Sequence, residues 1–514
     1  MGSNMYSKII SCGVLGIDGY IVEIETDISN GLPAFEIVGL GDTAVREARE
    51  RVRSAVKNSG YEFPLKKITL NMAPANIKKE GSSFDLAIAM GILTSSGYID
   101  QSAASKSMFI GELALDGGIK PVKGVLPMAV CAHRNGFRFL FLPEANAREA
   151  SVVKELHIVP VKDLRETAAI INGEIEIKYF EDTGGEVVPV YSDTVDFADV
   201  KGQENVKRAL EVAASGAHNC LMLGAPGCGK TMLARRLPTI LPSMTFEEAL
   251  EVTKIHSIAG ILPPGVSLVN TRPFRSPHHS ISDTGLVGGG SIPKPGEISL
   301  AHYGVLFLDE LPEFSKKALE ALRQPLEDGV ITISRVNASL TYPARTTLIC
   351  AANPCRCGYF LDQPGKCTCT PKQIQQYLSR LSGPLLDRLD IHIEVSPVKY
   401  AELESDKNVE SSLAIRERVE RTRKIQLDRY KGLNIYSNSQ LQPAMFAKFC
   451  RLDKKCRSIL RDVFDRLGMS ARAHSRILKV ARTIADMDMS EDIKPVHLTE
   501  AIQYRSLDRK AWNI

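Results

Sequence analysis

Residues 224–231 read Gly-Ala-Pro-Gly-Cys-Gly-Lys-Thr, a glycine-rich run that ends in a lysine and a threonine. Glycines let the backbone curl so that successive N–H groups point at phosphate oxygens. In such a loop Lys230 reaches the β- and γ-phosphates, and the hydroxyl of Thr231 binds Mg²⁺. An apolar strand pattern precedes the loop and a helical pattern follows it, which is the context that this chemistry requires. The sequence therefore predicts a nucleoside triphosphate site at Gly224, Ala225, Pro226, Gly227, Cys228, Gly229, Lys230 and Thr231.

An acidic pair follows a second apolar run farther along the chain, where residues 305–310 read Val-Leu-Phe-Leu-Asp-Glu. Such a run is typical of a buried parallel strand, and ligands bind at the carboxyl ends of these strands. We expect Asp309 to hold Mg²⁺, directly or through water, and Glu310 to polarise the attacking water as a general base. A surface acidic pair after a buried strand is the alternative for this motif taken alone.

Two further polar residues stand beside strand patterns. Asn353 ends a strand pattern over 346–353, where its amide could hydrogen-bond the γ-phosphate or the attacking water. The alternative is an asparagine that begins a turn before the next proline. Arg388 lies on a short connection before another apolar strand pattern. There it could complete a neighbouring subunit's site and stabilise transition-state charge, or form a surface salt bridge to an adjacent aspartate.

Four of the 11 cysteines cluster as two Cys-x-Cys pairs, Cys355 with Cys357 and Cys367 with Cys369. Four thiolates suit a tetrahedral zinc ion, although the one-residue spacer is shorter than the usual two to four. Because all four ligands would be protein thiolates, the metal would be structural and would fix the loop beside Asn353. Reduced free thiols are the alternative, and disulfides are not expected in a reducing compartment.

The composition is that of an ordinary globular chain. The 514 residues are too many for one core and indicate about three domains. A net charge of +4 is too small to indicate nucleic-acid binding, so any basic surface must be local. No apolar run approaches the length of a membrane span, and no signal peptide is evident, so we expect a cytoplasmic protein without membrane contact.

Hydrophobic patterning predicts a multidomain α/β architecture. Strands and helices alternate over 1–180, a turn-rich linker follows over 181–196, and a second α/β region spans 197–397. After residue 398 the strand patterns stop, and helical periodicity continues to the end of the chain. The expected strands are 19–26, 35–38 and 67–71, and the expected helices are 43–59, 84–95, 126–135, 411–431, 443–467 and 471–488.

The order of phosphate loop, Asp-Glu strand, Asn strand and arginine resembles an AAA+ ATPase, whose parallel-sheet core would span 197–397. Residues 200–203 resemble the segment that encloses the adenine in that superfamily. The segments 272–279, 285–290 and 296–302 resemble its magnesium-chelatase-like branch. The whole chain is similar to the ComM/YifB group of that branch. This resemblance implies ATP and Mg²⁺ as cofactors, a homo-hexameric ring with ATP at the subunit interfaces, and a C-terminal helical lid.

The resemblance also implies two insertions that face the centre of the ring. These correspond to residues 286–295 and to a hairpin over 331–341, with Lys294 and Arg335 as candidates for contact with the DNA phosphate backbone. Solvated loop charges are the alternative for each residue taken singly. In the helical lid, residues 470–476 resemble the second sensor of the family, so that Arg472 or Arg476 would touch the γ-phosphate.

The N-terminal region resembles the proteolytic α+β domain of Lon-type proteases. Ser83 corresponds to the nucleophile of those enzymes, but Leu126 stands where the catalytic lysine is required. A serine without a base is a poor nucleophile, so we expect no peptidase activity. We expect Ser83 to cap the helix over 84–95, and the domain to serve binding or assembly.

The leading hypothesis is an ATP-hydrolysing motor that acts on single-stranded or branched DNA, of the helicase or branch-migration type, in recombination or natural transformation. A magnesium-chelatase-type subunit that remodels a metal-insertion partner is the first alternative. An ATP-dependent Lon-like protease and a nucleotide-gated scaffold are two further alternatives. The protease is disfavoured by Leu126, and the scaffold would require Glu310 to be inactive.

Overall fold

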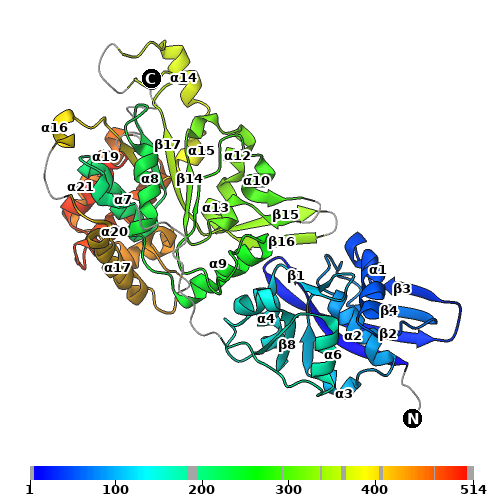
Figure 1. The fold of residues 1–514 in the computed structure, drawn as a ribbon. Helices are drawn as coiled ribbons and strands as arrows, with labels where there is room; N and C mark the ends of the chain where they lie inside the picture. The colour runs from blue at the N-terminus through cyan, green and yellow to red at the C-terminus, as the bar shows by residue number, and fades with distance from the viewer. Residues whose placement is uncertain are drawn as a thin grey trace. The chain divides into compact units, whose positions relative to one another are not determined.

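A computed structural model of the chain describes residues 5–181, 195–290, 293–335, 338–360, 366–404, 409–433, 435–467 and 469–505. The chain folds as two compact units, which are shown in Figure 1. The first comprises Met1–Val188 and Ala249–Val269, and the second comprises Pro189–Glu248 and Asn270–Ile514. Most of the predicted linker, residues 182–194, lies outside the described residues. The predicted boundary at 397–398 does not separate two compact units, and the three-domain division stays a prediction.

The N-terminal unit is built on a seven-stranded mixed sheet with the order β3-β4-β2-β1-β5-β8-β9. Its longest pair, β1 and β2, is antiparallel, whereas β5, β8 and β9 run parallel to β1. Buried residues alternate with partly exposed residues along most of β2 and β4, which explains why these segments form strands with one face in the core. The strands are β1 (Tyr6–Leu15), β2 (Asp18–Ser29), β3 (Ala34–Val38), β4 (Lys67–Ala73), β5 (Ser107–Phe109), β8 (Phe139–Pro143) and β9 (His157–Val161).

Helices α1 (Thr43–Asn58), α2 (Asp85–Ser95) and α4 (Val125–Arg134) lie within one residue of the predicted helices at both ends. The predicted helix cap at Ser83 is wrong. Phe84 is the residue before α2, and its side chain makes no capping hydrogen bond. The first helical residue, Asp85, is buried, and its carboxylate accepts hydrogen bonds from Arg51 at 2.7 Å and from the N–H of Leu113 at 3.3 Å. Asp85 therefore connects the start of α2 to Arg51 and to Leu113.

A segment from the middle of the sequence completes the N-terminal unit. Most of helix α9 (Phe246–Ala259) and the residues up to Val269 belong to it. Lys254 pairs with Asp18 at 3.6 Å, and the carbonyl of Ser257 accepts a hydrogen bond from Gly124 at 3.3 Å. The carboxyl group of Glu149 also accepts from the Ser257 hydroxyl, and burial raises the pKa of that carboxyl. The sequence patterns did not predict this assignment of the segment.

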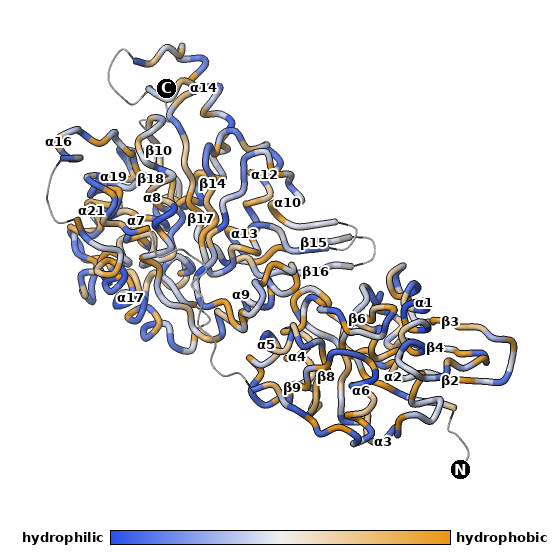
Figure 2. The backbone as a smooth tube through the Cα atoms, viewed as in Figure 1, coloured by the Kyte–Doolittle hydropathy of each residue, from blue (hydrophilic) through white to orange (hydrophobic). Residues whose placement is uncertain are grey.

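The second unit contains a five-stranded parallel sheet with the order β11-β14-β17-β10-β18. Every residue of β10, β14 and β17 is buried, as expected for central parallel strands made of continuous apolar runs. Figure 2 shows hydrophobic residues along β14 and β17. The strands are β10 (Cys220–Leu223), β11 (Phe274–Arg275), β14 (Val305–Leu308), β17 (Thr347–Ala352) and β18 (Ile391–Glu394).

The C-terminal region is helical, as the sequence predicts. A continuous helix over 443–467 is wrong, however, because α18 (Phe446–Phe449) ends before a new helix begins at Lys454. The side chain of Asp453 accepts the N–H of Cys456 at 2.6 Å and so caps the new helix. The long helices are α17 (Ser412–Arg429), α19 (Lys454–Leu467), α20 (Ala471–Met487) and α21 (Pro495–Gln503). Of the helices in the described ranges, none has both the length and the apolar character needed to cross a membrane.

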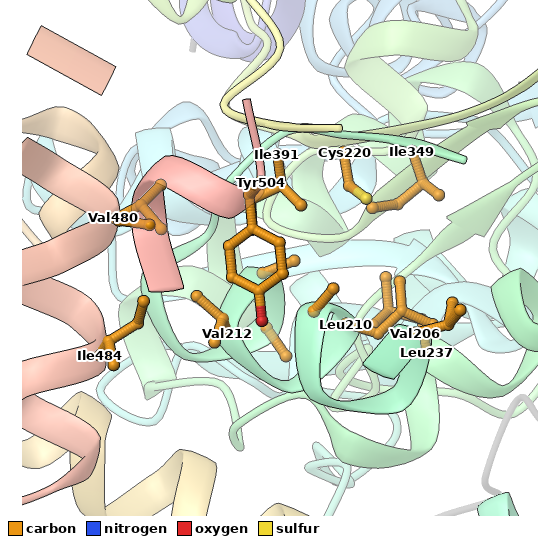
Figure 3. Packing of buried hydrophobic residues seen from close by; sticks show 14 of the residues in the cluster. Val206, Leu210, Val212, Cys220, Leu237, Ile349, Ile391, Val480, Ile484 and Tyr504 are labelled. Carbon is orange, nitrogen blue, oxygen red and sulfur yellow. The ribbon is translucent and has the colours of Figure 1, made fainter. Parts of the chain in front are cut away.

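These helices share one hydrophobic core with the parallel sheet. The ring of Tyr504 lies among side chains from the sheet, from helix α7 (Glu204–Gly216) and from α20 (Figure 3). Ile484 of α20 and Cys220 of β10 belong to the same buried cluster. The C-terminal helices therefore stabilise the sheet that carries the phosphate loop.

Because the core is shared, we expect a cavity beside α20 to destabilise the sheet as well as the helix. Truncation of the buried side chain in Ile484→Ala should lower the free energy of unfolding by about 2–5 kcal/mol. Hydrogen exchange should accelerate in both α20 and β10. The control Leu413→Ala removes a side chain that is 67% exposed and should change the free energy by less than about 0.5 kcal/mol. Faster exchange confined to the C-terminal helices would contradict a common core.

Candidate nucleotide site

The phosphate loop leaves β10 and enters helix α8 (Lys230–Ile240). Gly227 and Gly229 have φ angles of 77° and 90°, in the left-handed region that favours glycine. A Cβ atom at Gly224 would lie 2.3 Å from the carbonyl oxygen of Val395. The strand-to-helix turn therefore requires glycine for two different reasons, a positive φ angle and a close backbone approach.

The Lys230 side chain connects the loop to the neighbouring strand. Its ammonium group is 2.7 Å from the carbonyl oxygen of Gly224, 2.9 Å from that of Ala225 and 3.1 Å from Oδ1 of Asn353. Lys230 is only 9% exposed, so these contacts replace most of its hydration. The structure thus brings together two residues that are far apart in the sequence. Lys230 was predicted to reach the γ-phosphate, and Asn353 to bond either the γ-phosphate or the attacking water.

The predicted magnesium ligands also lie together. The hydroxyl of Thr231 donates to Oδ2 of Asp309 at 2.6 Å, so one oxygen atom from each residue lies close enough to the other to bind the same ion. Hydroxyl and carboxylate oxygens are ligands that Mg²⁺ prefers. The next residue, Glu310, adopts a left-handed backbone with φ of 52°, and its side chain is 55% exposed. A half-exposed carboxylate beside the predicted magnesium ligands is accessible to a water molecule.

Glu310 has a partner that the sequence patterns did not predict. Nδ1 of His279 lies 3.3 Å from Oε2 of Glu310. The adjacent His278 instead contacts the hydroxyl of Ser280 at 2.8 Å. Both histidines stand in the segment 272–279, whose likeness to the magnesium-chelatase-like branch suggested no role for either ring. The paired histidines were the available signal, but spacing alone does not show which one faces the acid.

Gln203 connects the loop to the end of β18. Its side-chain amide donates to the carbonyl oxygens of Cys228 at 2.8 Å and Ser396 at 2.9 Å. Its φ of 57° is left-handed, which is uncommon for a residue other than glycine. The segment 200–203 was predicted to enclose the adenine, and the structure adds a role in fixing the phosphate loop.

Arg388 lies just before β18, at the amino edge of the sheet and therefore opposite the phosphate loop. It is 6% exposed, forms an ion pair with Glu327 and donates to the carbonyl oxygen of Pro384 at 2.6 Å. The alternative of a surface salt bridge to an adjacent aspartate is not the observed arrangement. In its own chain Arg388 does not reach the phosphate loop.

Arg476 also lies at the amino edge, where it pairs with Asp390 at 3.0 Å. Nδ1 of His218 is 3.3 Å from the same carboxylate. Although burial disfavours the charged form, Arg476 and His218 hold the pKa of the Asp390 carboxyl well below its usual range. Arg472 is exposed at the start of α20. Because Arg476 is engaged at the far edge, it does not contact the phosphate loop of its own chain.

Both segments that were predicted to be insertions contain a pair of antiparallel strands. Strands β12 (Gly288–Gly289) and β13 (Lys294–Pro295) pair in the first, and the side chain of Lys294 is exposed. Strands β15 (Val330–Arg335) and β16 (Ala338–Pro343) pair in the second, which projects from the second unit in Figure 1. The backbone of Arg335 ends β15, but its side chain lies outside the described residues, as do residues 336–337.

The four clustered cysteines are brought together. The Sγ atoms of Cys355, Cys357, Cys367 and Cys369 all lie within 4.8 Å of one another, an arrangement that could hold a metal ion.

In the N-terminal unit, Leu126 is fully buried in α4, and its N–H donates to Glu149 at 2.8 Å. An apolar side chain therefore occupies the position that the sequence resemblance assigns to the base of a Lon-type protease.

Comparison with protein families matches three segments of the chain. Residues 196–403 match the family described as magnesium chelatase, subunit ChlI. Residues 24–146 match the family described as subunit ChlI of Mg-chelatase, and residues 409–505 match the C-terminal family of subunit ChlI. The family matched by residues 196–403 is of the AAA+ type, which implies ATP hydrolysis with Mg²⁺.

Individual relatives extend over almost the whole chain. The competence protein ComM of Haemophilus influenzae is 44% identical over 98% of this chain and 97% of its own length. The uncharacterized protein YifB of Escherichia coli is 43% identical over 96% of each chain. A Lon protease of Methanosarcina barkeri is 27% identical, but over only 29% of this chain and 20% of its own length. The chain therefore belongs to the ComM/YifB family of magnesium-chelatase-like AAA+ proteins.

Proposed function

We propose that this chain is an ATP-driven motor that works as a homo-hexameric ring on single-stranded or branched DNA. The observation that carries the proposal is the contact between its two hairpin insertions. The hydroxyl of Tyr342 in β16 donates to the carbonyl oxygen of Pro293, beside β13, at 2.7 Å. The hairpins also approach closely at Gly288, where a Cβ atom would lie 2.9 Å from Cδ1 of Ile333. A movement of one insertion would therefore be transmitted to the other.

The chemistry of the two hairpins suits a nucleic-acid backbone. Ile331 and Ile333 are buried, while the hydroxyl groups of facing pairs on β15 and β16 are exposed. Serine and threonine hydroxyls, together with the exposed ammonium group of Lys294, can donate hydrogen bonds to phosphate oxygens without reading the base sequence. Such contacts suit a motor that moves along DNA irrespective of its sequence.

The residues around the phosphate loop can perform hydrolysis. Lys230 would neutralise charge on the β- and γ-phosphates, and Asn353 would orient the γ-phosphate or the attacking water. Mg²⁺ held by Thr231 and Asp309 would supply further charge neutralisation at the phosphates. Glu310 is the base that polarises the water, and His279 fixes the direction of its carboxylate.

The position of Arg388 supports an intersubunit site. Its guanidinium group lies at the opposite edge of the sheet from its own phosphate loop, so it can serve only another subunit's nucleotide. In the described structure its buried Nε atom has no hydrogen-bond partner, which leaves one donor for a further acceptor. In the ring, Arg388 would exchange Glu327 for the γ-phosphate of the neighbouring subunit.

The name of the Haemophilus relative, a competence protein, favours natural transformation or recombination as the setting of this activity. A motor subunit that remodels a metal-insertion partner is the second candidate, because the matched families are described by a magnesium chelatase subunit. The DNA dependence of ATP hydrolysis separates the two candidates. A Lon-like protease is disfavoured by the buried Leu126.

Removal of the general base should abolish turnover but preserve binding. Glu310→Gln keeps the shape of the side chain and should lower kcat for ATP by about 10²- to 10⁴-fold, because the amide cannot accept the proton of the attacking water. Steady-state hydrolysis and the binding of a fluorescent ATP analogue give the two quantities. The control Glu313→Gln changes a nearby carboxylate that pairs with Arg380. Hydrolysis that is equally fast in both variants would contradict the assignment.

His279 is a positioning residue for Glu310, so its loss should affect kcat more than KM. We expect His279→Ala to lower kcat by about 10- to 100-fold, since a misdirected carboxylate orients the water poorly. The adjacent His278→Ala is the matched control, because His278 contacts Ser280 instead. Equal effects of the two substitutions on kcat would show that the contact with Glu310 has no catalytic role.

A DNA motor should hydrolyse ATP faster in the presence of its track. We expect forked, four-way and single-stranded DNA to stimulate hydrolysis, and Lys294→Ala to reduce this stimulation while the basal rate is unchanged. For single strands, the slope of log affinity against log salt should fall by about 0.7 for each lost phosphate contact. Lys431→Ala, at another exposed lysine, is the control. Hydrolysis that is indifferent to every DNA structure would exclude the motor and favour the chelatase-type subunit.

A further inference from the structure

The sulfur atoms of the cysteine cluster have the spacing of ligands around a single metal ion. The Sγ atoms of Cys355 and Cys357 are 3.3 Å apart, those of Cys355 and Cys367 are 3.8 Å apart, and those of Cys357 and Cys367 are 3.6 Å apart. A tetrahedral ion with zinc–sulfur bonds of about 2.3 Å requires sulfur atoms about 3.8 Å apart. The observed distances lie close to that value, and Cys369 completes the set.

Neither a disulfide nor a set of isolated thiols fits this geometry as well. A disulfide would bring two sulfur atoms to about 2.05 Å, and all four cysteines are free. Four thiols that share no ligand would not be expected to converge on one point from two separate parts of the segment. Four thiolates occupy every position of a tetrahedral ion, so the site is structural and offers no position for a substrate.

The segment that carries the cysteines has little hydrophobic core of its own. Its buried cluster consists of Cys355 together with three side chains of helix α14 (Pro371–Leu378), which are Ile374, Tyr377 and Leu378. Such a small apolar cluster contributes little burial, and small folds of this kind commonly require a metal or a disulfide. A metal ion would join the two halves of the segment at the point where Cys355 meets the helix.

The same segment touches the phosphate loop at both ends of its first Cys-x-Cys pair. On one side, Asn353 accepts a hydrogen bond from Lys230 at 3.1 Å. On the other side, Gly358 adopts a φ of 89°, and a Cβ atom there would lie 2.3 Å from Cδ of Pro226. The backbone at Gly358 therefore packs directly on the proline ring of the phosphate loop.

We propose that Cys355, Cys357, Cys367 and Cys369 bind one Zn²⁺ ion, and that this zinc site braces the phosphate loop through Asn353 and Gly358. Binding replaces the thiol protons, which pass to solvent, and changes no oxidation state. The ion holds the turn between Cys355 and Gly358 in the conformation that supports Pro226. Loss of zinc would release this support and weaken ATP binding, although the site lies outside the nucleotide contacts themselves.

Metal analysis of the full-length chain tests the first half of this proposal. We expect one zinc ion per wild-type chain by plasma mass spectrometry, and loss of that zinc in Cys367→Ser and Cys369→Ser. The control Cys131→Ala removes a cysteine of the N-terminal unit and should retain the metal. Iron in place of zinc, no bound metal, or full zinc content in both serine variants would overturn the assignment.

Binding of a fluorescent ATP analogue tests the second half. We expect the Kd to rise about tenfold when zinc is removed from the wild-type chain by a chelator, and to recover when zinc is restored. Gly358→Ala should retain its zinc but show a similar rise in Kd, because the added methyl group collides with Pro226. This variant requires no mutation of a metal ligand, so it separates bracing from metal binding.

Gly383→Ala is the matched control for the glycine substitution. Gly383 begins α15 (Gly383–Leu386), within the same connection between β17 and β18, and a Cβ atom there would meet nothing within 4 Å. Its Kd and zinc content should equal those of the wild-type chain. A zinc-bound Gly358→Ala that binds the analogue as tightly as Gly383→Ala would overturn the bracing role, and so would an unchanged Kd after removal of the metal.

Discussion

The arrangement of the nucleotide site depends on the hydrogen bonds of the Lys230 ammonium group. This single cation contacts two carbonyl groups of its own loop and the side chain of Asn353, which directly follows β17. Because β10 and β17 are parallel neighbours, their carboxyl ends meet at one edge of the sheet. Lys230 connects these ends, and Thr231 makes the corresponding contact with Asp309 beyond β14. The phosphate loop is therefore fixed by residues from two other strands.

The apolar support of this edge is spread over much of the second unit. The sheet and the C-terminal helices form one buried cluster, so the helices are part of the structure that holds the loop in place. Gln203 and Gly358 also approach the loop, from two separate segments. The loop is thus held by strands below it, by Gln203 beside it and by the cysteine-bearing turn against Pro226.

Local chemistry allowed much of the site to be predicted from the sequence. Glycines that require positive φ angles, a lysine and threonine after them, and an acidic pair after a buried strand all leave patterns over a few residues. Arg388 and Arg476 were harder, because the sequence does not show that Glu327 and Asp390 are their ion-pair partners. The contact between His279 and Glu310 was also not predictable, since it depends on how distant segments pack.

The fold shows the same division between local and distant determinants. Helices with regular hydrophobic periodicity were predicted to within one or two residues. The break in the predicted helix 443–467 was missed because the hydrophobic pattern continues across it. Only the cap formed by Asp453 marks the start of the new helix at Lys454. The assignment of most of α9 to the N-terminal unit was missed because no helix was predicted over these residues, and the sequence between two strands of the second unit does not show that its segment belongs elsewhere.

The path of the chain between its two units has a consequence for modularity. The chain passes from one unit to the other at Val188, again at Glu248 and again after Val269. Excision of the N-terminal region at residue 181 would therefore leave residues 249–269 behind without the rest of the compact unit to which they belong. The N-terminal unit therefore cannot be excised or exchanged as one continuous segment. Any chimera of this protein with another must carry residues 1–188 and 249–269 together.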